Sequence, residues 1–406
     1  MGCARTARSG FSPLDEQLGL VAGTLTPRSQ DHLTHLVTWM PFERATQMLK
    51  ALTGVQVSEA SARRHAYRVG EALVAVQGAQ AMGPVAPPLA SSCQSKHIIS
   101  PDGAMVPLLH GQWAEVKTVV VGCVQAEKPD GSVHCHDLSY FSRMLEASTF
   151  SEQASAELLR RGIDQVEQVG AIHDGAEWID GFVDWQRNDA VRILDFAHAA
   201  EYVSEIGQLA QSAGAVLPQD WLQDHLHELK HVGPKAVLDE LRRLRDQYPH
   251  LEELGKKLTY LLKREARMQY PTYQAAGWPI GSGCVESGNK VVMQARLKGP
   301  GMHWAPSHVD PMLVLRTVAC NDRWEEGSEQ AVLQFQQQQV TKRQHHQSQR
   351  YDAQLRLLQA SLLWWRSRLH RRAPSAPSPV PLTLKLSGSS RPSATHPWRR
   401  PLLAKK

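Results

Sequence analysis

The hydrophobic pattern of residues 97–194 constrains the fold of this chain more than any other feature of its sequence. Residues 115–124 read Glu-Val-Lys-Thr-Val-Val-Val-Gly-Cys-Val, a β-branched run that is typical of a β-strand. Further strands are predicted over 97–100, 104–109, 137–143, 166–173 and 190–194, a Pro-Asp-Gly turn at 101–103, and helices over 151–162 and 177–186. This order indicates an α/β domain with a mixed sheet.

Helical patterns precede and follow this region. Upstream, apolar residues at helical spacing predict three helices between residues 31 and 73, with Gly54 ending the second and Ser58 capping the third. Downstream, the pattern is helical from about residue 199 to 268. It breaks near Gly277 and resumes over 284–297 and 309–326.

The third upstream helix has two distinct faces. Its polar face carries Ser61, Arg64 and Arg68, and its apolar face carries alanine, valine and leucine. The three helices have the layout of a helix-turn-helix, whose recognition helix presents short polar and arginine side chains to the DNA major groove. DNA binding is therefore predicted for these three residues. A plain helical cap is the alternative interpretation.

Composition excludes several classes of protein. No segment approaches the ~18 consecutive apolar residues of a membrane-spanning helix, and the N-terminus lacks the apolar core of a secretory signal. The 6 cysteines include no C-x-x-C pair, which argues against a zinc ribbon and a thioredoxin motif, and they are too few for a disulfide scaffold. We expect a cytoplasmic, nucleoid-associated protein without a membrane partner.

The positive net charge comes entirely from the C-terminal region. Residues 341–406 hold 14 of the 45 Lys and Arg residues and one of the 40 acidic residues, so the first 340 residues hold 31 basic and 39 acidic ones. A basic tail favours nucleic acid through counterion release, without sequence specificity. An unselected or frame-shifted C-terminus is the alternative explanation.

Three acidic residues occur where strands or turns end or where a helix begins: Asp102 in Ile-Ile-Ser-Pro-Asp-Gly, Asp174 in Ala-Ile-His-Asp-Gly, and Glu286 in Gly-Ser-Gly-Cys-Val-Glu. Each alone is weak evidence, because Asp-Gly is a common turn and a glutamate suits the first turn of a helix. Asp195 and His198, in Asp-Phe-Ala-His, follow the last predicted strand and strengthen the set.

Together these segments resemble those of bacterial insertion-sequence transposases of the ISKra type, within the Mutator-like DDE superfamily. The resemblance covers about residues 10–328 in collinear order. Its segments begin Phe11-Ser-Pro-Leu, Met40-Pro-Phe-Glu-Arg-Ala, Gly54-Val-Gln-Val-Ser, Asp174-Gly-Ala-Glu-Trp-Ile, Ile193-Leu-Asp-Phe-Ala-His, Gly281-Ser-Gly-Cys-Val-Glu-Ser, Gly301-Met-His-Trp, Leu315-Arg and Arg323-Trp-Glu-Glu.

The resemblance implies a transposase that cleaves the ends of its own element and transfers them to target DNA. Asp102, Asp174 and Glu286 would be the catalytic, metal-binding carboxylates, and Asp195 and His198 would match a supporting Asp/Cys-x-x-His signature. The cofactor would be Mg²⁺, with Mn²⁺ as a substitute. The partners would be double-stranded DNA and a second copy of the chain, or more, in the DNA complex.

The chemistry of the acidic set agrees with this expectation. Two Mg²⁺ ions can serve the attacking and leaving oxygens of a phosphodiester, and Mg²⁺ prefers carboxylate oxygens. Three crowded carboxylates would raise one another's pKa unless cations occupied the site. Arg296, Lys298 and His303 follow the helix of Glu286 and are predicted to hold phosphates, with a solvated basic face as the alternative.

The expected organisation is an all-α region followed by an RNase H-like mixed sheet with a helical insertion. Its parts are an irregular N-terminal remnant over 1–30, a helix-turn-helix-like region over 31–75, a linker over 76–96, a catalytic domain over 97–330 with an insertion at about 203–272, and a basic, partly disordered tail over 331–406.

Other functions remain open at this stage. The main alternative is a truncated, catalytically inactive relic that only binds DNA. A cellular RNase H-like nuclease without strand transfer is a third hypothesis, and the long helical insertion argues against it. A glycosidase with two carboxylates is the weakest, because no barrel repeat is visible.

Overall fold

The computed structural model describes residues 25–83, 96–125 and 133–369, so the predictions for the N-terminal remnant before residue 25 and for the tail after residue 369 lie outside it. The chain divides into two units, residues 1–339 and 340–406. None of the helices in the described ranges is long and apolar enough to cross a membrane.

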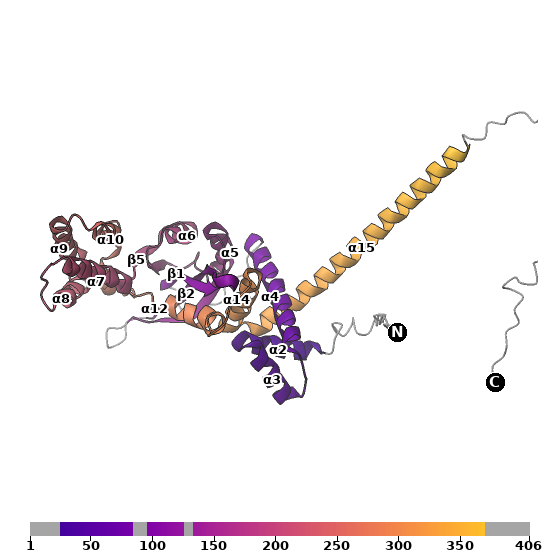
Figure 1. Ribbon diagram of the computed structural model, residues 1–406, viewed down its shortest axis with the longest axis horizontal. Coiled ribbons are helices and arrows are strands. Elements are labelled where there is room, and N and C mark those ends of the chain that lie inside the picture. Colours follow the sequence, from indigo (N-terminus) through magenta and orange to yellow (C-terminus); the bar gives the residue numbers. More distant parts are fainter. Residues whose placement is uncertain (1–24, 84–95, 126–132, 370–406) are drawn as a thin grey trace, which may run out of the picture. The chain divides into compact units, whose positions relative to one another are not determined.

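One mixed sheet forms the centre of the first unit (Figure 1). Its described strands lie in the order β3-β2-β1-β4-β5. They are β1 (Lys96–Pro107), β2 (Trp113–Val124), β3 (Cys135–Arg143), β4 (Gln168–His173) and β5 (Val191–Leu194). The first three strands are antiparallel, β4 runs parallel to β1, and β5 runs parallel to β4. The predicted α/β class and the mixed sheet are confirmed.

The turn predicted at residues 101–103 is wrong, because β1 continues through it. The strand pairs with β2 without interruption from His97↔Cys123 to Pro107↔Trp113. The long β-branched β2 provides a partner for every residue of the Pro-Asp-Gly segment, and this pairing outweighs the local turn preference. Proline is compatible with this position because β4 pairs with β1 only as far as Ile99.

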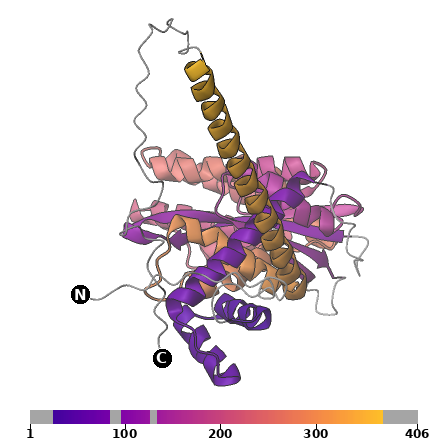
Figure 2. The same ribbon diagram turned by 90° about the vertical axis from the view of Figure 1, so that its right-hand side faces the viewer.

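Helices cover both faces of the sheet, as Figure 2 shows. Successive side chains of a strand point to opposite faces, and Ile98 and Ile99 accordingly belong to different cores. On the Ile99 side, Phe150 of α5 (Ala147–Arg160) and Phe182 of α6 (Glu177–Arg187) pack against the sheet. The Ile98 side is continuous with the core of the downstream helices.

The region between β5 and residue 275 is helical, as the sequence predicted for the insertion. It contains α7 (Phe196–Ser212), α8 (Trp221–His231), α9 (Pro234–Gln247), α10 (Glu252–Leu262), the short 3-10 helix η2 (Glu265–Arg267) and α11 (Tyr270–Ala275). Buried leucines such as Leu238, Leu241 and Leu258 join these helices to one another and to Ile98 of the sheet. Figure 1 shows α7–α10 gathered beside the sheet.

The helix carrying Glu286 is not regular throughout. It consists of α12 (Gly283–Gly288), a π-helical stretch η3 (Asn289–Gln294) and α13 (Ala295–Leu297). A wide π-turn commonly marks a functional site within a helix. The chain then enters α14 (Pro306–Cys320), in which residues 311–319 are all buried.

The upstream region forms three helices, α2 (Pro27–Trp39), α3 (Phe42–Thr53) and α4 (Glu59–Met82). The predicted ends are confirmed: Gly54 follows α3 with φ of 73°, and the Ser58 side chain accepts a hydrogen bond from the Ser61 backbone N–H at the start of α4. The helix α4 extends past residue 75, into the range expected to be a linker. It does so because it packs along α14.

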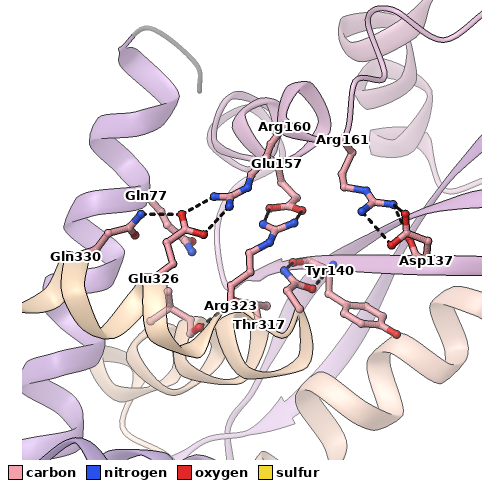
Figure 3. Close-up of polar contacts among 12 residues, drawn as sticks. Gln77, Asp137, Tyr140, Glu157, Arg160, Arg161, Thr317, Arg323, Glu326 and Gln330 are labelled. Atoms are coloured by element: carbon pink, nitrogen blue, oxygen red, sulfur yellow. Dashed lines mark hydrogen bonds and ion pairs between the residues drawn. The ribbon is translucent and has the colours of Figure 1, made fainter. Parts of the chain in front are cut away.

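Two buried or half-buried ion pairs join α5 to the start of the last helix, α15 (Trp324–Leu369), as Figure 3 shows. Arg323 donates to both carboxylate oxygens of Glu157 at 2.6 and 2.8 Å. Arg160 binds Glu326 in the same two-point manner and holds the pKa of that carboxyl below its usual range. Paired guanidinium–carboxylate contacts of this kind give geometric specificity.

The second unit contains the rest of α15. The sequence predicted a basic helix here, and residues 340–369 are helical. The side chains of residues 340–368 are exposed, including those of Leu358, Leu362 and Trp365.

The contact of α4 with α14 makes a testable prediction at Gly70. A Cβ atom at Gly70 would lie 2.3 Å from the backbone oxygen of Pro311, whereas a Cβ at Gly78 of the same helix would meet no described atom within 4 Å. We expect Gly70→Ala to lower the free energy of unfolding by about 1–3 kcal/mol. Gly78→Ala should instead raise it by up to about 1 kcal/mol, through helix propensity. Urea unfolding of the two variants measures both, and a stable Gly70→Ala variant would contradict this packing.

Candidate active site

The register between β1 and β4 brings two of the predicted catalytic residues together. The parallel pairs run from Lys96↔Gln168 to Ile99↔Ala171. Asp102 lies three residues beyond Ile99 on β1, and Asp174 lies three residues beyond Ala171, immediately after β4 ends at His173. Two residues earlier in each segment, the Ser100 hydroxyl donates to the Ile172 carbonyl at 2.7 Å, so the two segments are still adjacent there. Neighbouring strands lie about 4.8 Å apart, so the two aspartates share one edge of the pairing.

Asp102 is a half-buried carboxylate with two hydrogen bonds. Its Oδ1 accepts from the Gly103 backbone N–H at 2.8 Å, and its Oδ2 accepts from the Asn289 side-chain amide at 2.7 Å. Burial is the largest of the causes that raise the pKa of Asp102 to about 6. The nearby carboxylates of Asp174 and Glu286 act in the same direction, and the two hydrogen bonds act in the opposite one. Both of the other predicted carboxylates therefore act electrostatically on Asp102.

Asp174 begins the turn that follows β4. Its Oδ1 accepts from the Ala176 N–H at 3.0 Å, next to the start of α6. Two side chains of the helical insertion hold the same turn: the Tyr260 hydroxyl donates to the Asp174 carbonyl, and the Arg264 guanidinium donates to the Gly175 carbonyl. Gly175 has φ of 82°, and a Cβ there would collide with Arg264, so this position requires glycine.

Asp195 connects the end of β5 to the segment before Glu286. It is buried, and its two carboxylate oxygens accept from the backbone N–H of Ser282 at 3.1 Å and from the Ser282 hydroxyl at 3.0 Å. The next N–H along, that of Phe196, donates to the Ile280 carbonyl at 2.9 Å. Asp195 thus sets the path of the chain into α12.

His198 lies one turn into α7, among aromatic rings. It contacts the edges of Tyr202 and Tyr260, and its Nδ1 lies 3.6 Å from a carboxylate oxygen of Glu201. Because Tyr260 in turn bonds to the Asp174 carbonyl, His198 supports the site through a neighbour and has no hydrogen bond to Asp102, Asp174 or Glu286 among the contacts of the described residues.

Glu286 is exposed on α12, which lies against β1 and β2. Asn289, one helical turn further on, is buried and reaches Asp102. Within the described ranges, no three His, Cys, Asp or Glu side chains are gathered closely enough to form a ready-made metal centre. The three carboxylates are neighbours in an electrostatic sense, on β1, after β4 and on α12.

The residues of the predicted recognition helix divide into two groups. Arg64 is exposed and donates to the Ser61 hydroxyl at 3.2 Å. Arg68 is half-buried, with its guanidinium 4.9 Å from the ring centre of Phe335, and burial lowers its pKa. Ser61 and Arg64 therefore remain available to a ligand, whereas the side chain of Arg68 packs against the start of α15.

The three residues predicted to hold phosphates also differ from one another. Lys298 and His303 are exposed. Arg296 is 2% exposed, donates to the Val37 carbonyl of α2 at 2.9 Å and lies against the rings of Phe42 and Trp304. The Arg296 guanidinium therefore joins the upstream helices to the rest of the unit, and it faces no solvent from which a phosphate could approach. Burial correspondingly lowers its pKa to about 10.

Sequence reasoning missed Asn289, Tyr260, Arg264 and the role of Ser282. A signal existed for Asn289, because it stands three residues after Glu286 and so shares a face of the same helix. Tyr260 and Arg264 lie 86 and 89 residues along the chain from the groups that they bind, so no local pattern could reveal them.

A pocket of about 60 Å³ lies elsewhere, beside the ion pairs of Figure 3, and is lined by residues that include Gln77, Tyr140 and Gln330. None of the three predicted carboxylates lines it. No protein-family model matches this chain, and no curated protein matches it either.

The raised pKa of Asp102 predicts a gain in stability when its charge is removed. At pH 8, above the folded pKa of about 6, the folded protein must hold a half-buried anion. As the pH falls below 6, the carboxyl takes up a proton in the folded state and this cost decreases, until it disappears below the ordinary pKa of 3.8. We therefore expect Asp102→Asn to raise the free energy of unfolding by about 1–2 kcal/mol at pH 8, with chelator present, and by less at pH 5.

The measurement is urea unfolding at both pH values. The exposed Asp246, at the end of α9, provides the control, and Asp246→Asn should change stability little. A variant at Asp102 that is less stable than wild type at pH 8 would contradict the prediction.

Proposed function

We propose that this protein is a DDE transposase, in which an RNase H-like domain cleaves and joins DNA strands at the ends of an insertion sequence. The observation that carries the proposal is that two carboxylates from distant segments lie close enough to Asp102 to act on it. Asp102 and Asp174 each lie three residues beyond the last β1–β4 pair, Ile99↔Ala171, and the pKa of Asp102 responds to both Asp174 and Glu286. The strand order and directions of the sheet are compatible with an RNase H-like fold.

The residues at this edge fit a divalent cation. The charged groups that act on the pKa of Asp102 are the two other carboxylates. Grouped carboxylates favour binding of a hard metal ion such as Mg²⁺ or Mn²⁺. Asp102, Asp174 and Glu286 would hold it. When bound, the metal would activate the attacking oxygen and stabilise the charge that develops on the phosphate.

The protein's own contribution is to hold these carboxylates in place. Asp102 lies on the most central strand, between β2 and β4. The turn of Asp174 is braced by Tyr260 and Arg264 from the insertion. Asp195 fixes the segment that leads to Glu286. Positioning of this kind lowers the entropic part of a reaction barrier.

Several exposed basic groups are available to the DNA. Arg64 and Ser61 lie near the start of α4, and Lys298 and His303 follow the Glu286 helix. The exposed residues 340–368 of α15 add Lys342, Arg350 and Arg356. In this proposal α4 reads the element ends and the other groups hold phosphates. Strand transfer has to bring two ends together, so we expect at least two copies of the chain in the DNA complex.

The first prediction of this proposal concerns DNA cleavage. In Mg²⁺ we expect the wild-type protein to nick DNA that carries the element ends. Asp102→Asn, Asp174→Asn and Glu286→Gln should each reduce the rate on the order of 10²–10³-fold, because each removes a carboxylate from the metal site. Asp246→Asn is the matched control and should retain the activity. The measurement is a gel assay of end-labelled DNA.

Two results of this assay would count against the proposal. Nicking that survives all three substitutions would identify a different active site or a contaminating nuclease. A wild-type protein that binds the ends and never nicks them would instead identify the inactive, DNA-binding alternative.

The second prediction of this proposal concerns recognition of the element ends. Arg63 and Arg64 are neighbours on α4, but Arg63 pairs with Glu59 and lies against the ring of Phe42. Removing either charge should weaken non-specific binding and lower its salt dependence equally. Only Arg64→Ala should lose discrimination between the element ends and random DNA, by about 1–3 kcal/mol. Fluorescence anisotropy at several salt concentrations tests this, and equal discrimination by the two variants would refute a recognition role for Arg64.

A further inference from the structure

Asn289 carries a buried oxygen atom whose hydrogen-bonding capacity is unused. The residue is 3% exposed, and its Nδ2 donates to Asp102 Oδ2 at 2.7 Å. Its Oδ1 has no hydrogen-bond partner in the part of the chain that the structure describes. The orientation of the amide follows from chemistry, because an ionised carboxylate only accepts and so must face the NH₂ group. A buried acceptor without a partner costs free energy, so the position of Oδ1 calls for a partner.

The local backbone brings this amide to the sheet. Gly288 precedes Asn289, and a Cβ there would lie 2.7 Å from Val120 of β2 and 3.2 Å from the Tyr140 ring of β3. Only glycine permits such a close approach of α12 to the strands. The π-helical stretch then begins at Asn289 itself. The close packing at Gly288 and the start of the π-helical stretch thus adjoin one another, and Asn289 is the residue that reaches Asp102.

The surroundings of Asn289 select the chemical class of that partner. The groups that act on the neighbouring Asp102 are the carboxylates of Asp174 and Glu286, which are negative and accept hydrogen bonds. Another anion would be repelled by this set. A neutral amide oxygen beside carboxylates is instead a usual ligand for a hard divalent cation, either directly or through a water bound to the cation.

We propose that Asn289 is a fourth cation-binding group of this site, with its Nδ2 orienting Asp102 and its Oδ1 serving the divalent cation. The inference rests on the proposed function for the location of the metal, and extends it to a residue outside the three carboxylates. It assigns the Glu-x-x-Asn spacing of residues 286–289 a role in metal binding, with Glu286 and Asn289 on one face of the helix.

The test measures Mn²⁺ binding to the full chain without DNA, by electron paramagnetic resonance, so that it does not depend on cleavage. We expect Asn289→Ala to weaken Mn²⁺ binding roughly 10–100-fold, as the loss of an auxiliary group at a metal site does. Asn289→Asp keeps an oxygen in place and adds a charge, so it should bind Mn²⁺ at least as tightly as wild type.

The matched control is Asn321, an amide with a structural role. Its Oδ1 accepts from the Tyr140 N–H at 2.8 Å and its Nδ2 donates to the Tyr140 carbonyl at 3.0 Å, so both of its groups are used within the protein. Asn321→Ala should lower the melting temperature and leave the Mn²⁺ affinity unchanged. If Asn289→Ala behaves in this same way, the inference is overturned.

Two further outcomes are decisive. If Asn289→Ala does not fold, the test uses Asn289→Asp alone. We expect Mn²⁺ to raise the melting temperature of Asn289→Asp more than that of wild type. A smaller rise overturns the inference. If the wild-type chain binds Mn²⁺ only while Asp102 and Asn289 are intact but nicks no DNA, the proposed function fails and the inference stands. A wild-type chain that binds no Mn²⁺ overturns it.

Discussion

The parallel pairing of β1 with β4 is the interaction on which the candidate site depends. It brings together the two segments that lead to Asp102 and Asp174, and its register is maintained by the alternation of Ile98 and Ile99 between two cores. A slip of one residue would turn the side chains of a strand to the opposite face, so that buried isoleucines and the half-buried aspartate would exchange environments. The burial of the isoleucines therefore fixes the position of the carboxylates, although the carboxylates themselves bury no apolar surface.

The site is also held from outside the sheet. The helical insertion supplies Tyr260 and Arg264 to the turn after β4, and Asp195 ties the start of α7 to Ser282 ahead of Glu286. The Tyr260 and Arg264 contacts are made to backbone carbonyls, so they fix the position of the turn rather than binding the Asp174 carboxylate. Burial then raises the pKa of Asp102. A buried carboxylate with a raised pKa lowers the free energy of unfolding when it is ionised. The same carboxylate favours a cation as its partner.

Arginine has two roles in this protein that composition cannot separate. Arg143, Arg296 and Arg316 are among the largest fully buried side chains. Arg296 and Arg316 donate to backbone carbonyls of other segments, whereas Arg143 donates to the Ser142 carbonyl and to the Gln77 side chain of α4. Arg296 and Arg316 bind the consecutive carbonyls of Val37 and Thr38 at the end of α2, where the last carbonyls of a helix lack partners. Such arginines hold the upstream helices on the rest of the unit, whereas Arg64 and Lys298 remain exposed for a ligand.

The sequence by itself determined the class of the fold, the order of its elements, and the acidic residues that end β4 and open α12. Short-range hydrophobic periodicity and capping residues such as Ser58 encode these features within a few turns of chain. Tertiary structure alone decided that β1 runs straight through residues 101–103, because the partner that outweighs the local turn lies on β2. It also buried Arg296 and brought Asn289 to Asp102, 187 residues away in sequence. Contacts of that separation arise from packing, which no local pattern records.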